Sequence, residues 1–207
     1  MRYRSLSVVS QPTIEPVTLA DAKQHMRVDT DDDNDYILAL ISAARRYAEE
    51  YLDRALITQQ LRMRVDTFPY EFELPRPPMA TAGTFTATAI TYALDPGSAS
   101  TATPTTTTLS ANSYRVDRDD TPGRIRTVYN GTWPSHLTDP NAVTVTWWAG
   151  YGAAASDVPQ AIRHAILMHV AHLYESRQAA VATGAVPQNV PFGVKALLDT
   201  CKWGSYA

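Results

Sequence analysis

Hydrophobic positions along this chain change their spacing twice, from a helical period to a strand period and back. In the first zone, apolar and aromatic side chains recur at three- and four-residue intervals: Ile37, Leu40, Ile41, Ala44, Tyr47, Ala48, Tyr51 and Leu52. This spacing places side chains on one face of an α-helix. We therefore predict a long helix, preceded by a short one from Leu19 to about Val28, with Thr18 and Asp21 forming a variant capping box.

The middle zone, from about residue 57 to 150, alternates apolar and polar residues instead. Leu61, Met63 and Val65 show the alternation of a half-buried strand, and the prolines of 72–78 mark the exit from it. Further strands are expected within the segments 84–94, 113–117, 124–129 and 142–152. The Thr-rich stretch 98–110 buries little apolar area, so we expect a mobile loop or hairpin tip.

Helical spacing returns after Pro159, with a broad apolar face: Ile162, Ala165, Ile166, His169, Val170 and Leu173. A last short helix is expected around Val194, Leu197 and Leu198. These zones predict an α+β fold, in which a helical bundle formed by the N- and C-terminal helices carries a central antiparallel β-rich insertion. The expected division is a discontinuous helical domain, 1–56 plus 157–207, and an insertion, 57–156.

The segment 29–35, DTDDDND, has aspartates on alternate positions and so suggests a calcium loop. An EF-hand loop needs Gly at position 6 and a bidentate Glu at position 12. Counted from Asp29, these positions hold Asn34 and Leu40, so both requirements fail. A long helix follows at once, and carboxylates ahead of a helix cap its free N–H groups and interact with its dipole. We expect 29–35 to be a helix-capping loop.

The overall composition narrows the class of protein. The chain has 207 residues, 44% of them hydrophobic, and a formal net charge of −3 with pI near 5.9, which argues against a dedicated nucleic-acid binder. Cys201 is the single cysteine, so no internal disulfide can form and a reducing compartment is expected. We find no signal peptide and no apolar run long enough for a membrane span, so we expect no membrane association.

Candidate chemistry is sparse. His169, His172 and Glu175 fall at i, i+3 and i+6 of a predicted helix, where two neighbours could share a metal ion. The HExxH pattern is absent, however, and no His or Cys motif supplies further ligands. Arg124 and Arg126 alternate on a predicted strand and are expected to be solvated. No cofactor motif and no catalytic constellation is found, so we predict that the chain is not an enzyme.

Four stretches together resemble the head–tail connector, or adaptor, proteins of long-tailed bacteriophages and of phage-derived gene transfer agents. They are PVTLADAKQHMRVD (16–29), the helix and its exit (43–60), VTVTWWAGYG (143–152), and 158–178 followed by VPFGVKALLD (190–199). The resemblance covers most of the chain and is weakest from about 76 to 120. Asp53 stands where such proteins often have Gly.

The resemblance implies a structural neck protein that forms a ring, typically of twelve copies, beneath the portal of a virion or phage-like particle. The ring would extend the DNA channel, through which the genome passes without specific binding, and would offer a platform for the stopper or next neck protein. Assembly in the host cytoplasm is expected. Phage and gene transfer agent both remain open, and so does a monomeric ligand-binding module or a metal-dependent enzyme using His169, His172 and Glu175.

The end of the chain is a candidate portal-binding segment. In the resembling family the C-terminal segment commonly reaches the portal. Here an aromatic-bearing tail follows the last periodic helix, and large aromatic side chains are frequent anchors of interfaces. We expect the segment 192–207 to dock on the portal, with the anchor residues Phe192, Lys202, Trp203 and Tyr206. The alternative is a frayed terminus.

Overall fold

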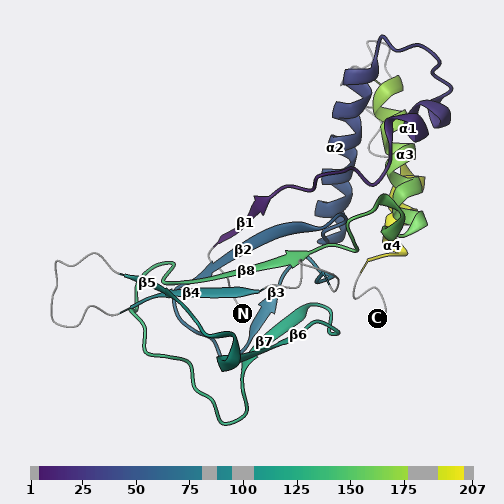
Figure 1. Ribbon diagram of the computed structural model, residues 1–207. Helices are drawn as coiled ribbons and strands as arrows, with labels where there is room; N and C mark the ends of the chain where they lie inside the picture. Colours follow the sequence, from purple (N-terminus) through teal and green to yellow (C-terminus); the bar gives the residue numbers. More distant parts are fainter. Residues whose placement is uncertain (1–4, 81–87, 95–104, 177–190, 203–207) are drawn as a thin grey trace, which may run out of the picture. The chain divides into compact units, whose positions relative to one another are not determined.

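The computed structural model describes residues 5–80, 88–94, 105–176 and 191–202. The chain forms two compact units (Figure 1). A β unit contains Met1–Pro12 and Thr58–Tyr151, and a helical unit contains Thr13–Ile57 and Gly152–Ala207. The predicted α+β class is confirmed, because helices from the two ends of the chain pack together and the strands between them pair antiparallel.

The larger sheet of the β unit has five strands in the order β1-β2-β8-β4-β5, all antiparallel. Their bounds are β1 Ser5–Ser10, β2 Gln59–Val65, β8 Val143–Ala149, β4 Ala89–Ala93 and β5 Thr106–Thr108. The predicted alternation is present in β2 and β8, where Leu61 faces Trp147 and Met63 faces Val145, all four fully buried. The core of this unit lies on that face of the sheet.

A second sheet of three strands has the order β3-β7-β6, again antiparallel. Its strands are β3 Phe72–Leu74, β7 Gly123–Thr127 and β6 Tyr114–Asp117, and the short 3₁₀ helix η2 (Ala111–Ser113) precedes β6. Phe72, Leu74 and Ile125 are fully buried on one face, whereas charged residues alternate with them on the other. One face is therefore core, and the other meets solvent.

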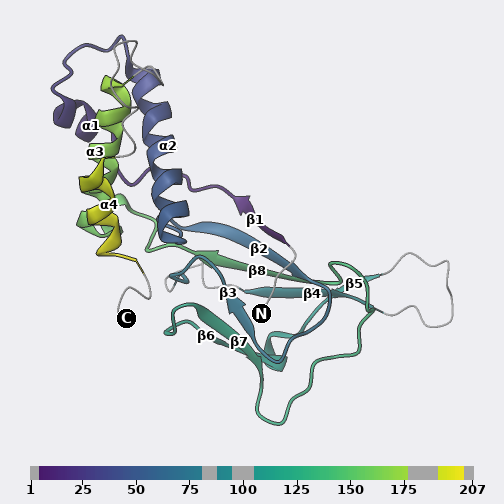
Figure 2. The ribbon, with the colours of Figure 1, turned by 180° about the vertical axis from the view of Figure 1, so that it is seen from behind.

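The helical unit contains α1 (Leu19–Met26), α2 (Asn34–Leu52), α3 (Gln160–Glu175) and α4 (Phe192–Asp199), with the 3₁₀ helix η3 (Ala155–Asp157) ahead of α3. Helices α2, α3 and α4 lie side by side in both views (Figures 1 and 2). Their shared core consists of Ile37, Ile41, Ala44, Ala48, Leu52, Ile162, Ala165, Ile166, Val170, Val194 and Leu198. None of the described helices is both long and apolar enough to cross a bilayer.

The caps of the first two helices differ from each other. Thr18 and Asp21 form the predicted capping box, with the Asp21 backbone N–H donating to Thr18 Oγ1 over 3.1 Å and the Thr18 N–H donating to Asp21 Oδ2 over 3.1 Å. The loop 29–35 does precede a helix, but Asp33, the N-cap of α2, makes no side-chain cap. Its carboxylate instead accepts a 2.6 Å hydrogen bond from the Tyr174 hydroxyl, so this part of the capping interpretation was wrong.

The end of α2 explains the unusual aspartate at position 53. Asp53 is the C-cap and has φ 50° and ψ 44°, in the left-handed region. Its N–H donates to the carbonyls of Glu49 and Glu50, which closes the last turn. Glycine is the usual residue in this conformation, and Asp is among the few others that tolerate it. Asp53 can therefore close this turn in place of Gly.

A buried ion pair, which no sequence pattern indicated, joins the segment before α1 to the turn after α2. Arg45 and Glu49 are 4% and 3% exposed, and Arg45 Nη1 donates to Glu49 Oε2 over 2.8 Å. Arg45 Nε donates to Glu15 Oε2 over 2.7 Å, and Glu49 Oε1 accepts from the Leu56 N–H over 3.1 Å. The two side chains thus join the segment before α1 to the turn after α2.

Three segments of the β unit differ from expectation. We placed residues 5–10 in the helical domain as an extended lead, but they form β1 and pair with β2. Residues 72–74 do not simply leave β2, since they form the separate strand β3. Within the Thr-rich stretch, 98–104 lies outside the described residues, while 106–108 form β5 paired with β4, so that part is not a loop.

Candidate functional site

The first part of the candidate site is the exposed start of α4. Val194 and Leu198 are buried against the other helices at 1% and 0% exposure, as expected for one face of a short amphipathic helix. Phe192, the first residue of α4, is 86% exposed. A phenyl ring left almost entirely in water contributes little to folding, so it is available to a partner.

The second part is the chain directly after α4. Lys202 Nζ lies 5.0 Å from the centre of the Tyr51 ring, and the Tyr51 hydroxyl donates a 2.7 Å hydrogen bond to Asp199 Oδ1. This hydrogen bond, together with partial burial and the Asp199 charge, raises the pKa of Tyr51. The contacts hold the exit of α4 against the C-terminal turn of α2. Lys202 is thereby positioned from within the helical unit.

The predicted anchor residues are therefore not gathered at one point by the described part of the chain. Phe192 begins α4, whereas Lys202 follows its end, and α4 has eight residues, or about 12 Å of helix at 1.5 Å per residue. Trp203 and Tyr206 lie outside the described residues. The assignment of these four side chains to portal binding stays a prediction.

Behind Lys202 lies an aromatic cluster between α2 and α3. The Tyr47 ring stacks on the Tyr51 ring with centroids 6.0 Å apart and meets the His169 ring edge-on at 4.7 Å. His169 is 5% exposed and its Nδ1 atom is buried without a hydrogen-bond partner among the described residues. Burial, and secondarily the nearby His172, lower the pKa of His169. The neutral ring is thus favoured.

The same observations bear on the alternative metal site. His169 packs into the helical core, while Glu175 is exposed near the end of α3. Among the residues that the structure describes, no group of three or more His, Cys, Asp or Glu side chains could hold a metal ion. The set His169, His172 and Glu175 is included in that statement, so this alternative gains no support.

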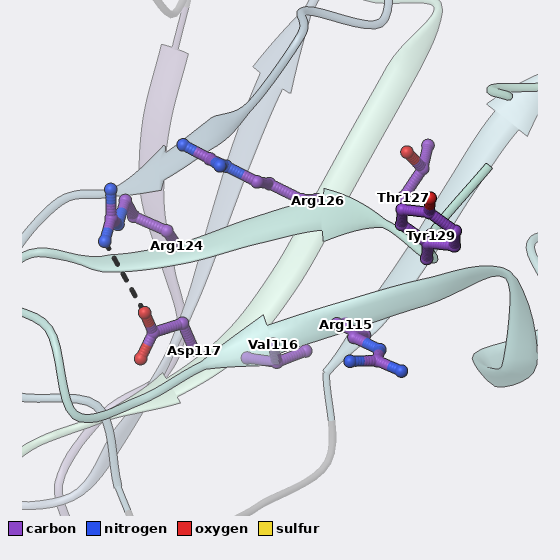
Figure 3. Close-up of a pocket in the computed structure, with 7 residues that line it drawn as sticks. All are labelled: Arg115, Val116, Asp117, Arg124, Arg126, Thr127 and Tyr129. Carbon is purple, nitrogen blue, oxygen red and sulfur yellow. Dashed lines mark ion pairs between the residues drawn. The ribbon is translucent and has the colours of Figure 1, made fainter. Parts of the chain in front are cut away.

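A second candidate surface, which sequence reasoning did not identify, lies on the outer face of the three-stranded sheet. An open pocket of about 400 Å³ there is lined by Arg115, Val116, Asp117, Arg124, Arg126, Thr127 and Tyr129 (Figure 3). Arg124 is not simply solvated, since it pairs with Asp117 at 3.6 Å and also contacts Asp120. Arg126 pairs with Glu71 and lies over the Tyr70 ring, 5.4 Å from its centre.

The exposed Phe192 and the charged outer face of the small sheet are both surfaces that another macromolecule could contact. Residues 16–76 match a family described as "Phage gp6-like head-tail connector protein". This match includes α1, α2 and the strands β2 and β3. The resemblance inferred from the sequence is confirmed over this segment.

Solved structures extend the likeness to nearly the whole chain. A chain in the "Neck of empty GTA particle computed with C6 symmetry" superposes with a TM-score of 0.72 at 24% identity, covering 96% of this chain and 95% of that one. A chain of the "Virion of native gene transfer agent (GTA) particle" gives 0.69 at 24% identity, covering 95% and 94%.

A third chain, from the "Neck of native GTA particle computed with C12 symmetry", gives a TM-score of 0.65 at 24% identity, with 96% and 94% coverage. These superpositions show that the chain has the fold of those neck chains. No curated protein matches the sequence.

Proposed function

We propose that this chain is a structural head–tail connector protein of the virion neck and not an enzyme. The observation that carries the proposal is the agreement of two independent comparisons. The family match covers α1 and α2, and the fold match to neck chains covers about the whole chain. A connector needs exposed contact surfaces and no reaction centre, which suits the exposed Phe192 and the charged face of the small sheet.

Several copies would assemble into a ring beneath the portal, extend the DNA channel and receive the next neck protein. Support for a ring comes from the C6 and C12 symmetry in which the similar neck chains were computed. We propose that the helical unit takes part in the contacts that build the ring. The net charge of −3 on the whole chain favours passage of DNA, because a strongly basic wall would bind phosphates and retard the genome.

The first test is direct association with the portal. Purified chain is mixed with the purified portal protein of the same particle and examined by electron microscopy and native mass spectrometry. We expect a ring of copies on one end of the portal. Failure of the chain to associate with the portal, in both isolated mixtures and assembling particles, would refute the function.

The portal contact itself is proposed to use the tail segment 192–207. Truncation after Asp199 keeps the Tyr51–Asp199 hydrogen bond and removes Lys202, Trp203 and Tyr206. We expect a soluble, folded protein with portal affinity reduced at least about tenfold, since interface aromatics are frequent hot spots. Particles made with it should package DNA but remain tailless. Sedimentation and circular dichroism check the fold, and pull-down on portal measures the affinity.

A matched truncation after Lys202 sharpens this test. It retains the contact of Lys202 with the Tyr51 ring and deletes only residues 203–207. Loss of binding in both truncations assigns the anchor to the segment 203–207, which carries Trp203 and Tyr206. Loss only in the truncation after Asp199 assigns it to residues 200–202, which include Lys202. Unchanged decoration of portal by both variants would make the tail a frayed end, and Phe192→Ser would then show whether the start of α4 makes the contact.

A further inference from the structure

The outer face of the three-stranded sheet arranges its charges in two rows. The register places Arg124 of β7 between Glu73 of β3 and Asp117 of β6, so the first row alternates in sign. In the second row Arg126 stands opposite Arg115, and Glu71 pairs with Arg126 from the other side. The second row therefore has two cations for one carboxylate. The excess positive charge belongs to Arg115.

Arg115 differs from its neighbours in having no partner. Its side chain is exposed, and it makes no hydrogen bond or ion pair with any residue that the structure describes. The guanidinium groups of Arg115 and Arg126 extend in opposite directions, whereas Arg124 turns toward Asp117 (Figure 3). Like charges directly opposite on paired strands disfavour the sheet. Folding thus gains nothing from an arginine at this position.

Two exposed tyrosines accompany this cation. Tyr129, which lines the pocket with Arg115, is 86% exposed, and Tyr70, under Arg126, is 84% exposed. Tyrosine and arginine are enriched in the energetically dominant parts of protein interfaces. We call Tyr70, Arg115, Arg126 and Tyr129 the Arg–Tyr face.

Charge on the same sheet selects the kind of partner. Glu71, Glu73, Asp117 and Asp120 lie on or beside this face. A duplex DNA backbone would meet these carboxylates as well as the arginines, and DNA-binding surfaces are normally an uninterrupted basic patch. A short acidic protein segment can instead place its carboxylates at Arg115 and leave the rest of the face to polar contacts. The face therefore fits an acidic peptide segment.

The chain itself carries such a segment. In the loop 29–35, Asp29, Asp32 and Asp35 are exposed and have no ion pair with a described residue, while Asp31 is bound by Lys23 at 2.7 Å. We propose that the Arg–Tyr face of one copy binds the acidic loop 29–35 of a neighbouring copy. A contact between two different patches of the same chain is heterologous, and its repetition builds a ring when the rotation between copies closes. The inference rests on the proposed ring.

The experiment is a charge exchange between the two patches. Arg115→Glu and the double variant Asp29→Lys with Asp32→Lys are titrated on purified portal, and occupancy is read by native mass spectrometry. Each of these two variants alone should fill the portal with lower cooperativity. Half-saturation should need a concentration at least about tenfold higher than for the unchanged chain, because like charges now face each other across the contact. An equimolar mixture of the two variants should recover part of the loss through alternating copies, and all three substitutions in one chain should restore the cooperative filling.

The controls separate this inference from the function beneath it. Arg64→Glu makes the same charge change at another exposed arginine of the β unit, and it should fill the portal like the unchanged chain. If the unchanged chain does not bind portal at all, the proposed function fails, and sedimentation of the same variants at high concentration decides the contact between copies.

Cooperative filling by Arg115→Glu equal to that of Arg64→Glu overturns the proposal. So does a loss that the combined variant does not restore. Fluorescence anisotropy with duplex DNA tests DNA as the other possible occupant of the face. If the unchanged chain binds DNA and Arg115→Glu does not, while Arg115→Glu still forms the ring, the face binds DNA and the contact between copies is refuted.

Discussion

The helical unit and the small sheet each contain ion pairs between arginine and carboxylate side chains. The pairs of the helical unit are buried or partly buried, whereas those of the small sheet are more exposed to solvent. Arg45 is almost fully buried and is satisfied by Glu15 and Glu49 within the unit. Arg126 is half exposed, shares Glu71 with Arg124, and stands opposite an unpaired Arg115. In the first network the arginine is fully paired within the unit, whereas the second includes an arginine, Arg115, without a carboxylate partner among the described residues.

The same residue types thus serve folding in one unit and are available for binding in the other. A buried charge is tolerated only if its hydrogen bonds are complete, so Arg45 and Glu49 specify one arrangement of the segments around α2. Exposed ion pairs contribute little to stability because water screens them. The arrangement on the small sheet is therefore free to be selected by a partner.

The largest expected effect comes from Arg45→Met. The substitution leaves Glu49 buried without its cation and Glu15 without its partner, so we expect a loss of about 3–5 kcal/mol in the free energy of unfolding. Urea denaturation measures it. Arg46→Met is the matched control on the exposed side of the same helix and should change stability by less than about 0.5 kcal/mol. Equal effects of the two substitutions would contradict a structural role of the buried pair.

A second effect follows from pH. An unfolded histidine titrates near 6.5, whereas buried His169 takes its proton only at lower pH, since burial lowers its pKa. Between these values the unfolded chain binds more protons, so the stabilisation by neutral His169 is complete above about pH 6.5 and is lost as pH falls through the lowered pKa. Urea midpoints between pH 7.5 and 5 should decline, and His169→Gln should flatten the decline.

Here the control is His164→Gln, which changes an exposed histidine of the same helix and should preserve the decline. A pH profile that is identical in the unchanged chain and in His169→Gln would remove His169 from the explanation.

The smallest effect is expected from Arg126→Met, the same substitution in the other network. The Arg126 side chain is 51% exposed, so water screens its pairing with Glu71, and removing it also relieves the opposition to Arg115. We expect a change in unfolding free energy close to zero, measured as for Arg45→Met. A loss as large as that of Arg45→Met would mean that the small sheet depends on its surface charges.

Local rules account for what the sequence could predict. The capping box at Thr18 and Asp21, the apolar face of α2 and the alternation of β2 and β8 each depend on residues close in the chain or on one repeating period. Even the departure at Asp53 follows from a backbone conformation that Asp tolerates.

The failures share a dependence on distant partners. Arg45 and Glu49 look like solvent-facing residues until Glu15, thirty positions away from Arg45, is brought beside them. The segment 5–10 is short, and its sequence pattern does not by itself predict a strand. Only its pairing with β2 defines one. The excess charge of Arg115 depends on the register of β6 against β7, which no local pattern fixes.

The N-terminal strand limits how such a chain can be recombined. Ile57 and Gly152 form a β-bridge, so the chain leaves the helical unit and returns to it at neighbouring backbone positions. This arrangement is typical of an inserted domain, and we call residues 58–151 the cassette. The cassette 58–151 is incomplete, however, because β1 comes from the far end of the sequence and covers one edge of β2. A hybrid that inherits residues 58–151 from one ancestor and residues 1–12 from another must match them strand against strand. The pairing of β1 with β2 therefore makes the two segments one structural unit despite their separation in the sequence.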